Sequence, residues 1–121
     1  MNHNLVPVVG WSYAAAANGI ANTTTAATIK AAAGAGLRNC ITAIQVMSEA
    51  LNTATELAIR DGAGGTVLWR TKIGTGGVTG GISIEFPTPV VGSANTLLEV
   101  VTLTASVTGA VYFNAQGFVA R

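Results

Sequence analysis

Residues 55–73 read TELAIRDGAGGTVLWRTKI, and this stretch decides the fold class. In residues 55–60 Leu57 and Ile59 fall on one side and Glu56 and Arg60 on the other, the two-residue period of a strand with one buried face. Residues 66–73 alternate in the same way, with Leu68 as an apolar residue on the polar side. The glycine-rich residues 61–65 can adopt the positive φ angles that a tight connection requires. We therefore predict a β-hairpin over residues 55–73.

The same period extends beyond this hairpin. Residues 82–86 (ISIEF) alternate cleanly between apolar and polar side chains. Residues 95–104 and 110–120 are rich in β-branched and aromatic side chains, which favour strands. We predict that these two segments form a second hairpin with its turn at residues 105–109. Because residues 95–104 are apolar on both faces, we expect this strand to be covered on both sides.

The N-terminal third carries conflicting signals. Its alanine runs favour helix by intrinsic propensity, whereas its threonine clusters and glycine interruptions oppose any long helix. We predict strands over residues 11–17, 24–32 and 38–47. The alternative is a helix over residues 42–57, whose larger apolar side chains would line one face.

The whole pattern predicts an all-β protein, an antiparallel jelly-roll or Greek-key sandwich of about seven or eight short strands. Pro87 and Pro89 directly follow a strand, so we expect the chain to leave the ladder there and cross to another edge or sheet. We divide the chain into an extended N-terminal arm, residues 1–10, and a single β-sandwich domain, residues 11–121.

The charge content excludes several partners. Charged residues make up 9% of the 121-residue chain, against roughly 25% in average soluble domains. A formal net charge of +1, with basic residues spread along the chain, predicts no binding to nucleic acid or to an anionic membrane surface. The sequence has no uninterrupted apolar segment long enough for a spanning helix. It also begins without a positively charged leader, so we expect synthesis in the host cytoplasm.

The inventory of chemically active side chains is short. His3 is the one histidine and Cys40 the one cysteine, so catalytic dyads, disulfides and zinc sites lack partners. The glycine-rich loops at residues 62–65 and 74–77 lack the Gly-Lys-Ser/Thr sequence and helix of a phosphate-binding loop. We predict no enzymatic activity, and no catalytic, cofactor-binding or metal-binding residues.

The distribution of charge carries more information than its amount. Residues 1–29, His3 apart, and residues 100–120 contain no aspartate, glutamate, lysine or arginine. Exposed neutral strands without charged side chains on their edges tend to associate with other chains. We therefore predict a homo-oligomer, a dimer or trimer, in which other subunits cover the neutral N- and C-terminal segments. The glycine-rich loop beginning at residue 74 is expected to order against a partner. The predicted interface residues are Val6, Pro7, Val8, Trp11, Tyr13, Gly76, Gly77 and Val78.

Five segments together resemble a family of small proteins encoded in the structural gene clusters of tailed bacteriophages: residues 11–17, 22–25, 29–39, 56–66 and 93–99. The resemblance covers nearly the whole chain and implies a virion context. Phage structural proteins of this size include decoration, or cement, proteins with jelly-roll folds that sit on the outer capsid and clamp neighbouring capsid subunits. The family offers no catalytic residues to transfer.

The resemblance leads to two functional expectations. The first is a capsid decoration protein on the head surface, which oligomerises and bridges subunits of the major capsid protein. The alternative is a tail-associated jelly roll that binds a receptor or glycan through exposed aromatic residues. The aromatic candidates for sugar stacking are Trp11, Tyr13, Trp69 and Tyr112.

Overall fold

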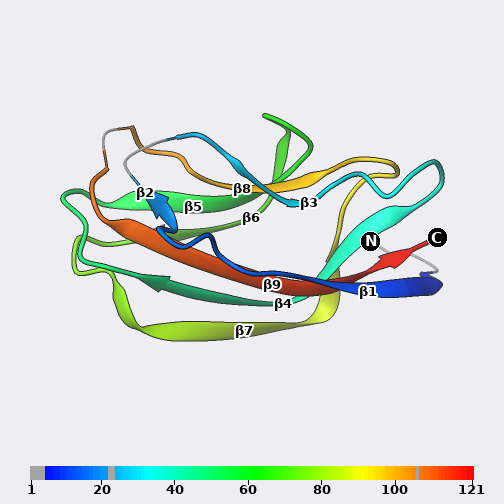
Figure 1. Ribbon diagram of the computed structural model, residues 1–121, viewed down its shortest axis with the longest axis horizontal. Helices are drawn as coiled ribbons and strands as arrows, with labels where there is room; N and C mark the ends of the chain where they lie inside the picture. The colour runs from blue at the N-terminus through cyan, green and yellow to red at the C-terminus, as the bar shows by residue number, and fades with distance from the viewer. Residues whose placement is uncertain (1–4, 22–23, 106) are drawn as a thin grey trace.

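The computed structural model describes residues 5–21, 24–105 and 107–121, and all regular secondary structure in these residues is β-strand. The strands form two antiparallel sheets that pack face to face as a sandwich (Figure 1). Expectations that involve residues 1–4, including His3, residues 22–23 and residue 106 lie outside the described residues.

Sheet A and sheet B contain strands from both halves of the chain. Sheet A has the order β1-β9-β4-β7, with a short β2 beside β9, where the bounds are β1 (Pro7–Tyr13), β2 (Ile20–Ala21), β4 (Arg38–Ser48), β7 (Val78–Val91) and β9 (Ala110–Ala120). Sheet B has the order β3-β8-β5-β6, with the bounds β3 (Ala27–Lys30), β5 (Thr55–Asp61), β6 (Thr66–Ile73) and β8 (Leu98–Thr102).

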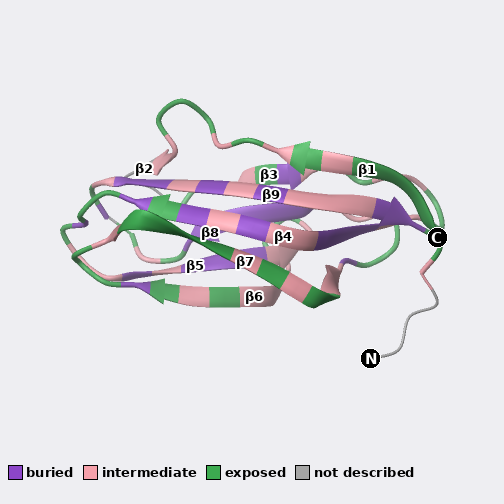
Figure 2. Cartoon of the chain, turned by 90° about the horizontal axis from the view of Figure 1, so that it is seen from below, coloured by how far each residue is buried: buried purple, intermediate pink, exposed green. Residues whose placement is uncertain are grey.

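The hydrophobic core lies between the two sheets. Strands β4, β8 and β9 carry most of the buried positions (Figure 2), and every residue of β8 is buried. The largest fully buried apolar side chains are Phe113, Ile41, Ile44, Leu57, Ile59, Ile73 and Leu98. Burial of these side chains is the main driving force for folding, so the central strands hold the sandwich together.

The predicted hairpin over residues 55–73 is confirmed as the antiparallel pair β5–β6. Its connection closes with a 2.9 Å hydrogen bond from the Gly65 N–H to the Gly62 carbonyl. The register shifts between Ile59 and Arg60, which leaves Leu68 without an opposing residue. Leu68 consequently packs against the core, and this β-bulge explains the break in the alternation.

The second predicted hairpin is wrong. Strand β8 pairs with β3 and β5 in sheet B, whereas β9 pairs with β1, β2 and β4 in sheet A. The connection between them therefore crosses from one sheet to the other. Each strand is apolar enough to be central, and in separate sheets each gains ladder partners on both sides.

The predicted crossover at Pro87 and Pro89 is also wrong. Strand β7 runs through both prolines and returns to β4, with Glu85 opposite Ala43 and Val90 opposite Ile41. Because β7 is an edge strand, prolines in this bulged stretch leave the rest of the ladder intact. The chain crosses to sheet B only after β7 ends.

The N-terminal third is confirmed as β-structure, and the alternative helix over residues 42–57 is contradicted by β4 and β5. The strand predicted over residues 38–47 is confirmed by β4, whereas β1 begins four residues earlier than predicted, at Pro7, and β3 has only four residues. The predicted arm, residues 1–10, overlaps β1, since Pro7, Val9 and Gly10 pair with β9 and Val8 lies in a β-bulge between them. The division at residue 10 stays a prediction.

Candidate interaction surface

The two sheets differ sharply in charge. Sheet B strands carry Lys30, Glu56, Arg60, Asp61, Arg70, Lys72 and Glu99, whereas sheet A strands carry only Arg38 and Glu85 among their described residues. Glu49 and Arg121 lie outside the strands. The neutral chain ends therefore gather in one sheet, because β1, β2 and β9 are neighbours there.

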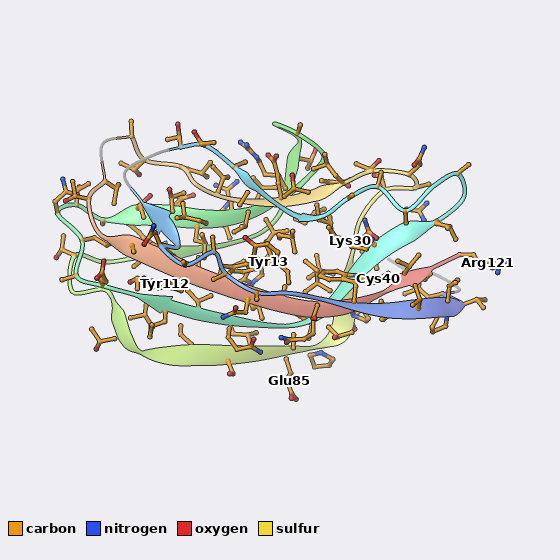
Figure 3. All side chains as sticks on the ribbon, in the orientation of Figure 1. Tyr13, Lys30, Cys40, Glu85, Tyr112 and Arg121 are labelled. Atoms are coloured by element: carbon orange, nitrogen blue, oxygen red, sulfur yellow. The ribbon has the colours of Figure 1, made fainter. Side chains whose placement is uncertain are left out.

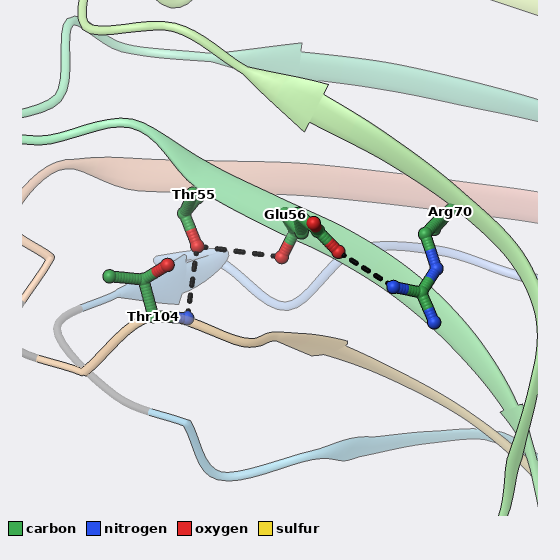
Figure 4. A network of polar contacts seen from close by, with 4 residues as sticks. All are labelled: Thr55, Glu56, Arg70 and Thr104. Carbon is green, nitrogen blue, oxygen red and sulfur yellow. Dashed lines mark hydrogen bonds and ion pairs between the residues drawn. The ribbon is translucent and has the colours of Figure 1, made fainter.

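The charges of sheet B are largely engaged with one another. The Arg60 guanidinium lies 2.6 Å from the Glu99 carboxylate, which is buried and also accepts the Gly64 N–H at 3.0 Å. A second, exposed ion pair joins Glu56 and Arg70 at 3.0 Å (Figure 4). Exposed pairs of this kind contribute little to the stability of the fold. Their main effect is to give sheet B a polar, hydrated surface.

The outer face of sheet A is lined by uncharged amides. Gln45 on β4 and Gln116 on β9 form a reciprocal pair, each amide N–H group donating to the other carbonyl, at 3.0 and 3.1 Å. Asn114 lies opposite Gln45 in the register and accepts the Ala15 N–H at 2.9 Å. Glu85 on β7 points away from the sandwich (Figure 3).

A shallow hollow of about 180 Å³ opens on this face beside the start of β7. The register of β4 against β7 shifts between Val46 and Ser48, and the extra residues of β7 include Gly81 at φ 73°. The hollow combines amide and hydroxyl groups with exposed apolar side chains, and its lining consists of Gln45, Val46, Met47, Gly80, Gly81, Ile82, Ser83 and Asn114.

The free edge of sheet A is apolar at its N-terminal end. Val6, Val8 and Val9 are 57%, 48% and 58% exposed, more than any other large hydrophobic side chain in the described chain. Arg121 anchors this segment through backbone hydrogen bonds with Val6 at 3.0 and 3.2 Å. The apolar side chains are thus held on ordered backbone rather than on a loose tail.

The structure distributes the predicted interface residues over two places. Val6, Pro7 and Val8 are exposed at the β1 edge, but Trp11 and Tyr13 on the same strand pack against the core. The other three, Gly76, Gly77 and Val78, lie at the β7 edge, on the opposite side of sheet A. The set does not form one patch.

Sequence reasoning missed the amide residues. Asn114 and Gln116 alternate with buried Phe113 and Ala115 along β9, so their period alone could have identified an uncharged outer face. Their partner Gln45 was detectable only through tertiary pairing.

The aromatic residues considered for sugar stacking do not gather into a platform. Trp69 meets Phe86 edge to face, with ring centroids 6.4 Å apart, and both rings pack against the core. Tyr13 lies toward the interior (Figure 3). Trp11 also packs against the core. Tyr112 lies opposite exposed Met47 in the register and alternates along β9 with buried Val111 and Phe113.

The remaining reactive groups occupy unreactive settings. Cys40 is fully buried, and burial raises the pKa of its thiol, an effect that nearby Arg38 partly offsets. Within the described ranges no group of three or more histidine, cysteine or carboxylate side chains is placed to hold a metal ion. The described residues also include no helix long and apolar enough to cross a membrane.

Comparison with known proteins yields no relative. No protein-family model matches the chain, and neither curated proteins nor solved structures provide a match. Function must therefore be argued from the surface of the molecule.

Proposed function

We propose that this protein is a virion structural protein of a tailed bacteriophage, a capsid decoration protein that oligomerises and stabilises the head. The observation that supports this proposal is the division of charge between the two sheets. A nearly uncharged sheet A with an apolar edge suits burial against other subunits, and a charged sheet B suits permanent exposure to solvent. Such a protein needs no catalytic group, and we propose that it has no enzymatic activity.

We further propose that the sandwich is a jelly roll. If short β2 is left aside, β1 at one end of the described chain pairs with β9 at the other, and β3 pairs with β8. The pairs β4–β7 and β5–β6 complete the two sheets in nested order. Nesting of this kind supports a chain folded back on itself as a double Greek key, the architecture of many viral capsid domains.

In this proposal the outer face of sheet A contacts the major capsid protein. Amide and hydroxyl groups hydrogen-bond across an interface without the desolvation cost of burying charges. The Gln45–Gln116 pair fixes two of these amides in position before binding. The partners are therefore further copies of the chain and the major capsid protein, and the location is the capsid surface.

The deciding experiment is a count of copies. Purified particles of the encoding phage would be analysed by quantitative mass spectrometry, with the major capsid protein as internal standard. Hundreds of copies that remain on tailless heads support decoration. A handful of copies that are lost with the tail contradict it.

The alternative, a tail-associated receptor- or glycan-binding module, is favoured by one observation, the amide-lined hollow beside Gly80 and Gly81. Amides and hydroxyls beside apolar Met47 and Ile82 are suited to a neutral saccharide. A glycan array would test this idea, with Asn114→Ala as the variant that must abolish any signal. Binding that survives Asn114→Ala would locate the sugar elsewhere.

A further inference from the structure

The edge strands of the sandwich are unequally protected against pairing with another chain. Strand β6 exposes Arg70 and Lys72, and β7 carries Glu85 and two prolines. Strand β3 is only four residues long and ends in a lysine. These are the devices by which β-proteins block association at their edges.

Strand β1 has two such devices at its start, Pro7 and a β-bulge at Val8 where the register against β9 shifts, but it lacks protection from Val9 to Tyr13. It has seven residues, none of them charged, and its one proline stands at the first position. Exposed Val8 and Val9 lie on it, and Val6 lies immediately before it. Among the described strands longer than four residues, β1 is thus the edge that is open to a further strand.

The hydrogen-bond pattern shows which backbone groups are free. Arg121 exchanges both backbone hydrogen bonds with Val6, so its peptide groups face the β1 side. Because orientation alternates along an antiparallel ladder, Val119, Gly117 and Ala115 face the same way, opposite Val9, Trp11 and Tyr13 of β1. The intervening residues Gly10 and Ser12 therefore direct their N–H and C=O groups toward the open edge.

We propose that β1 pairs antiparallel with β1 of a second copy of this chain, with a two-fold axis at Gly10. The two Gly10 residues then exchange backbone hydrogen bonds, Val9 lies opposite Trp11 of the partner subunit, and the two A sheets become one continuous sheet. This inference rests on the proposed function only in that both require self-association.

Three features favour a second copy over a foreign strand. An isologous contact places each residue near its own symmetry mate, which is tolerable here because β1 has no charge to repel its copy. Pro7, which lacks an N–H, and the bulge at Val8 end the ladder on one side, so the regular paired segment is short and centred on Gly10. Gly10 on the axis leaves no pair of symmetry-related side chains to clash there. Strand β1 also offers no charged group through which a strand of a different protein could be recognised.

Cysteine cross-linking tests the register directly. A Cβ built at Gly10 has its nearest neighbour, the Gly117 carbonyl oxygen, at 3.7 Å, so Gly10→Cys fits the fold. Native Cys40 is buried and does not compete. Under mild oxidation we expect a covalent dimer from Gly10→Cys, since paired strands bring Cα atoms within disulfide range.

One control defines the axis. Ser12→Cys alone should stay uncross-linked, because its symmetry mate is several residues away. If Gly10→Cys forms no covalent dimer at micromolar concentration, the pairing is refuted. If Ser12→Cys alone cross-links as efficiently as Gly10→Cys, the axis at Gly10 is wrong.

A proline variant tests the hydrogen bonds. Gly10→Pro removes an N–H that points away from β9 and toward the symmetry mate, so we expect it to fold but to raise the dimer dissociation constant about tenfold or more in light scattering. Thr88→Pro on the opposite edge strand β7 is the matched control and should leave association unchanged. Equal weakening by both substitutions would contradict pairing through β1.

The two proposals can fail separately. A β1-linked dimer found at only a few copies per particle would contradict the proposal of capsid decoration but would support pairing through β1. A protein that is monomeric in solution but covers the head in hundreds of copies would contradict the β1–β1 pairing and support decoration. It would also indicate that a segment of the capsid protein is the strand that pairs with β1.

Discussion

At the scale of single residues, Gly117 shows how closely the strands of sheet A approach one another. A Cβ at this position would lie 1.9 Å from the Cys40 carbonyl oxygen and 2.8 Å from the Trp11 ring. Both neighbours are fixed, one as backbone and the other as a packed indole. Glycine is therefore required here by contact with two adjacent strands.

We predict that Gly117→Ala destabilises the protein by about 1–3 kcal/mol through overpacking. Gly76→Ala is the control, because nothing lies within 4 Å of a Cβ at that exposed position. Its effect should stay within about 0.5 kcal/mol. Urea unfolding measures both. Equal stabilities for the two variants would show that the β1–β9–β4 spacing is wider than described.

Cys40 gives a residue-scale prediction about pH. Its folded thiol has a pKa above the ordinary value of 9.0, chiefly because burial disfavours the thiolate. The folded state thus holds this proton more tightly than the unfolded state, so the contribution is complete below about pH 9 and is lost as pH rises further. We expect the stability advantage of wild type over Cys40→Ala to shrink as the pH rises above about 9. A pH-independent difference would contradict this assignment.

At the scale of elements, one ion pair ties β8 to β5. Glu99 and Arg60 are opposite each other in the register, and the Glu99 side chain is only 7% exposed. The same carboxylate accepts the Gly64 N–H from the β5–β6 connection, so a single group joins two strands and a turn.

We predict that Glu99→Ala lowers the free energy of unfolding by about 3–5 kcal/mol, because it leaves the partly buried Arg60 charge without its ion-pair partner. Glu56→Ala, which breaks the exposed pair with Arg70, should cost less than about 1 kcal/mol. Thermal and urea unfolding of both variants checks the contrast. Similar losses for the two would mean that burial does not separate these pairs.

At the scale of the whole molecule, the sandwich has one neutral side and one charged side. If sheet A faces the capsid, a single added charge should act differently on the two sides. We predict that Ser83→Lys, on the exposed part of β7, reduces binding to undecorated heads by about tenfold, since an unpaired charge is costly to bury. Thr66→Lys, at the exposed start of β6, is the control and should bind like wild type.

Co-sedimentation with decoration-free heads would measure both affinities. Loss of binding with Thr66→Lys and retention with Ser83→Lys would reverse the proposed orientation. Melting temperatures of the two variants would exclude unfolding as the cause.

The amino-acid sequence by itself determined the class of this fold. The two-residue period of residues 55–60, 66–73 and 82–86 is local, and so are the glycines that end these strands; this information needed no tertiary contact. The low charge and its absence from the chain ends were equally readable. They predicted that part of the surface is neutral, without saying which part.

Only the tertiary structure decided which strands are neighbours. β8 and β9 are adjacent in the chain and would suit a hairpin, yet each is placed at the centre of a different sheet, where it gains ladder partners on both edges. Trp11 and Val9 stand two residues apart on β1, but the ring packs inward while Val9 stays exposed at the free edge. Pairing and burial depend on contacts between residues far apart in sequence, so strand period alone cannot assign them.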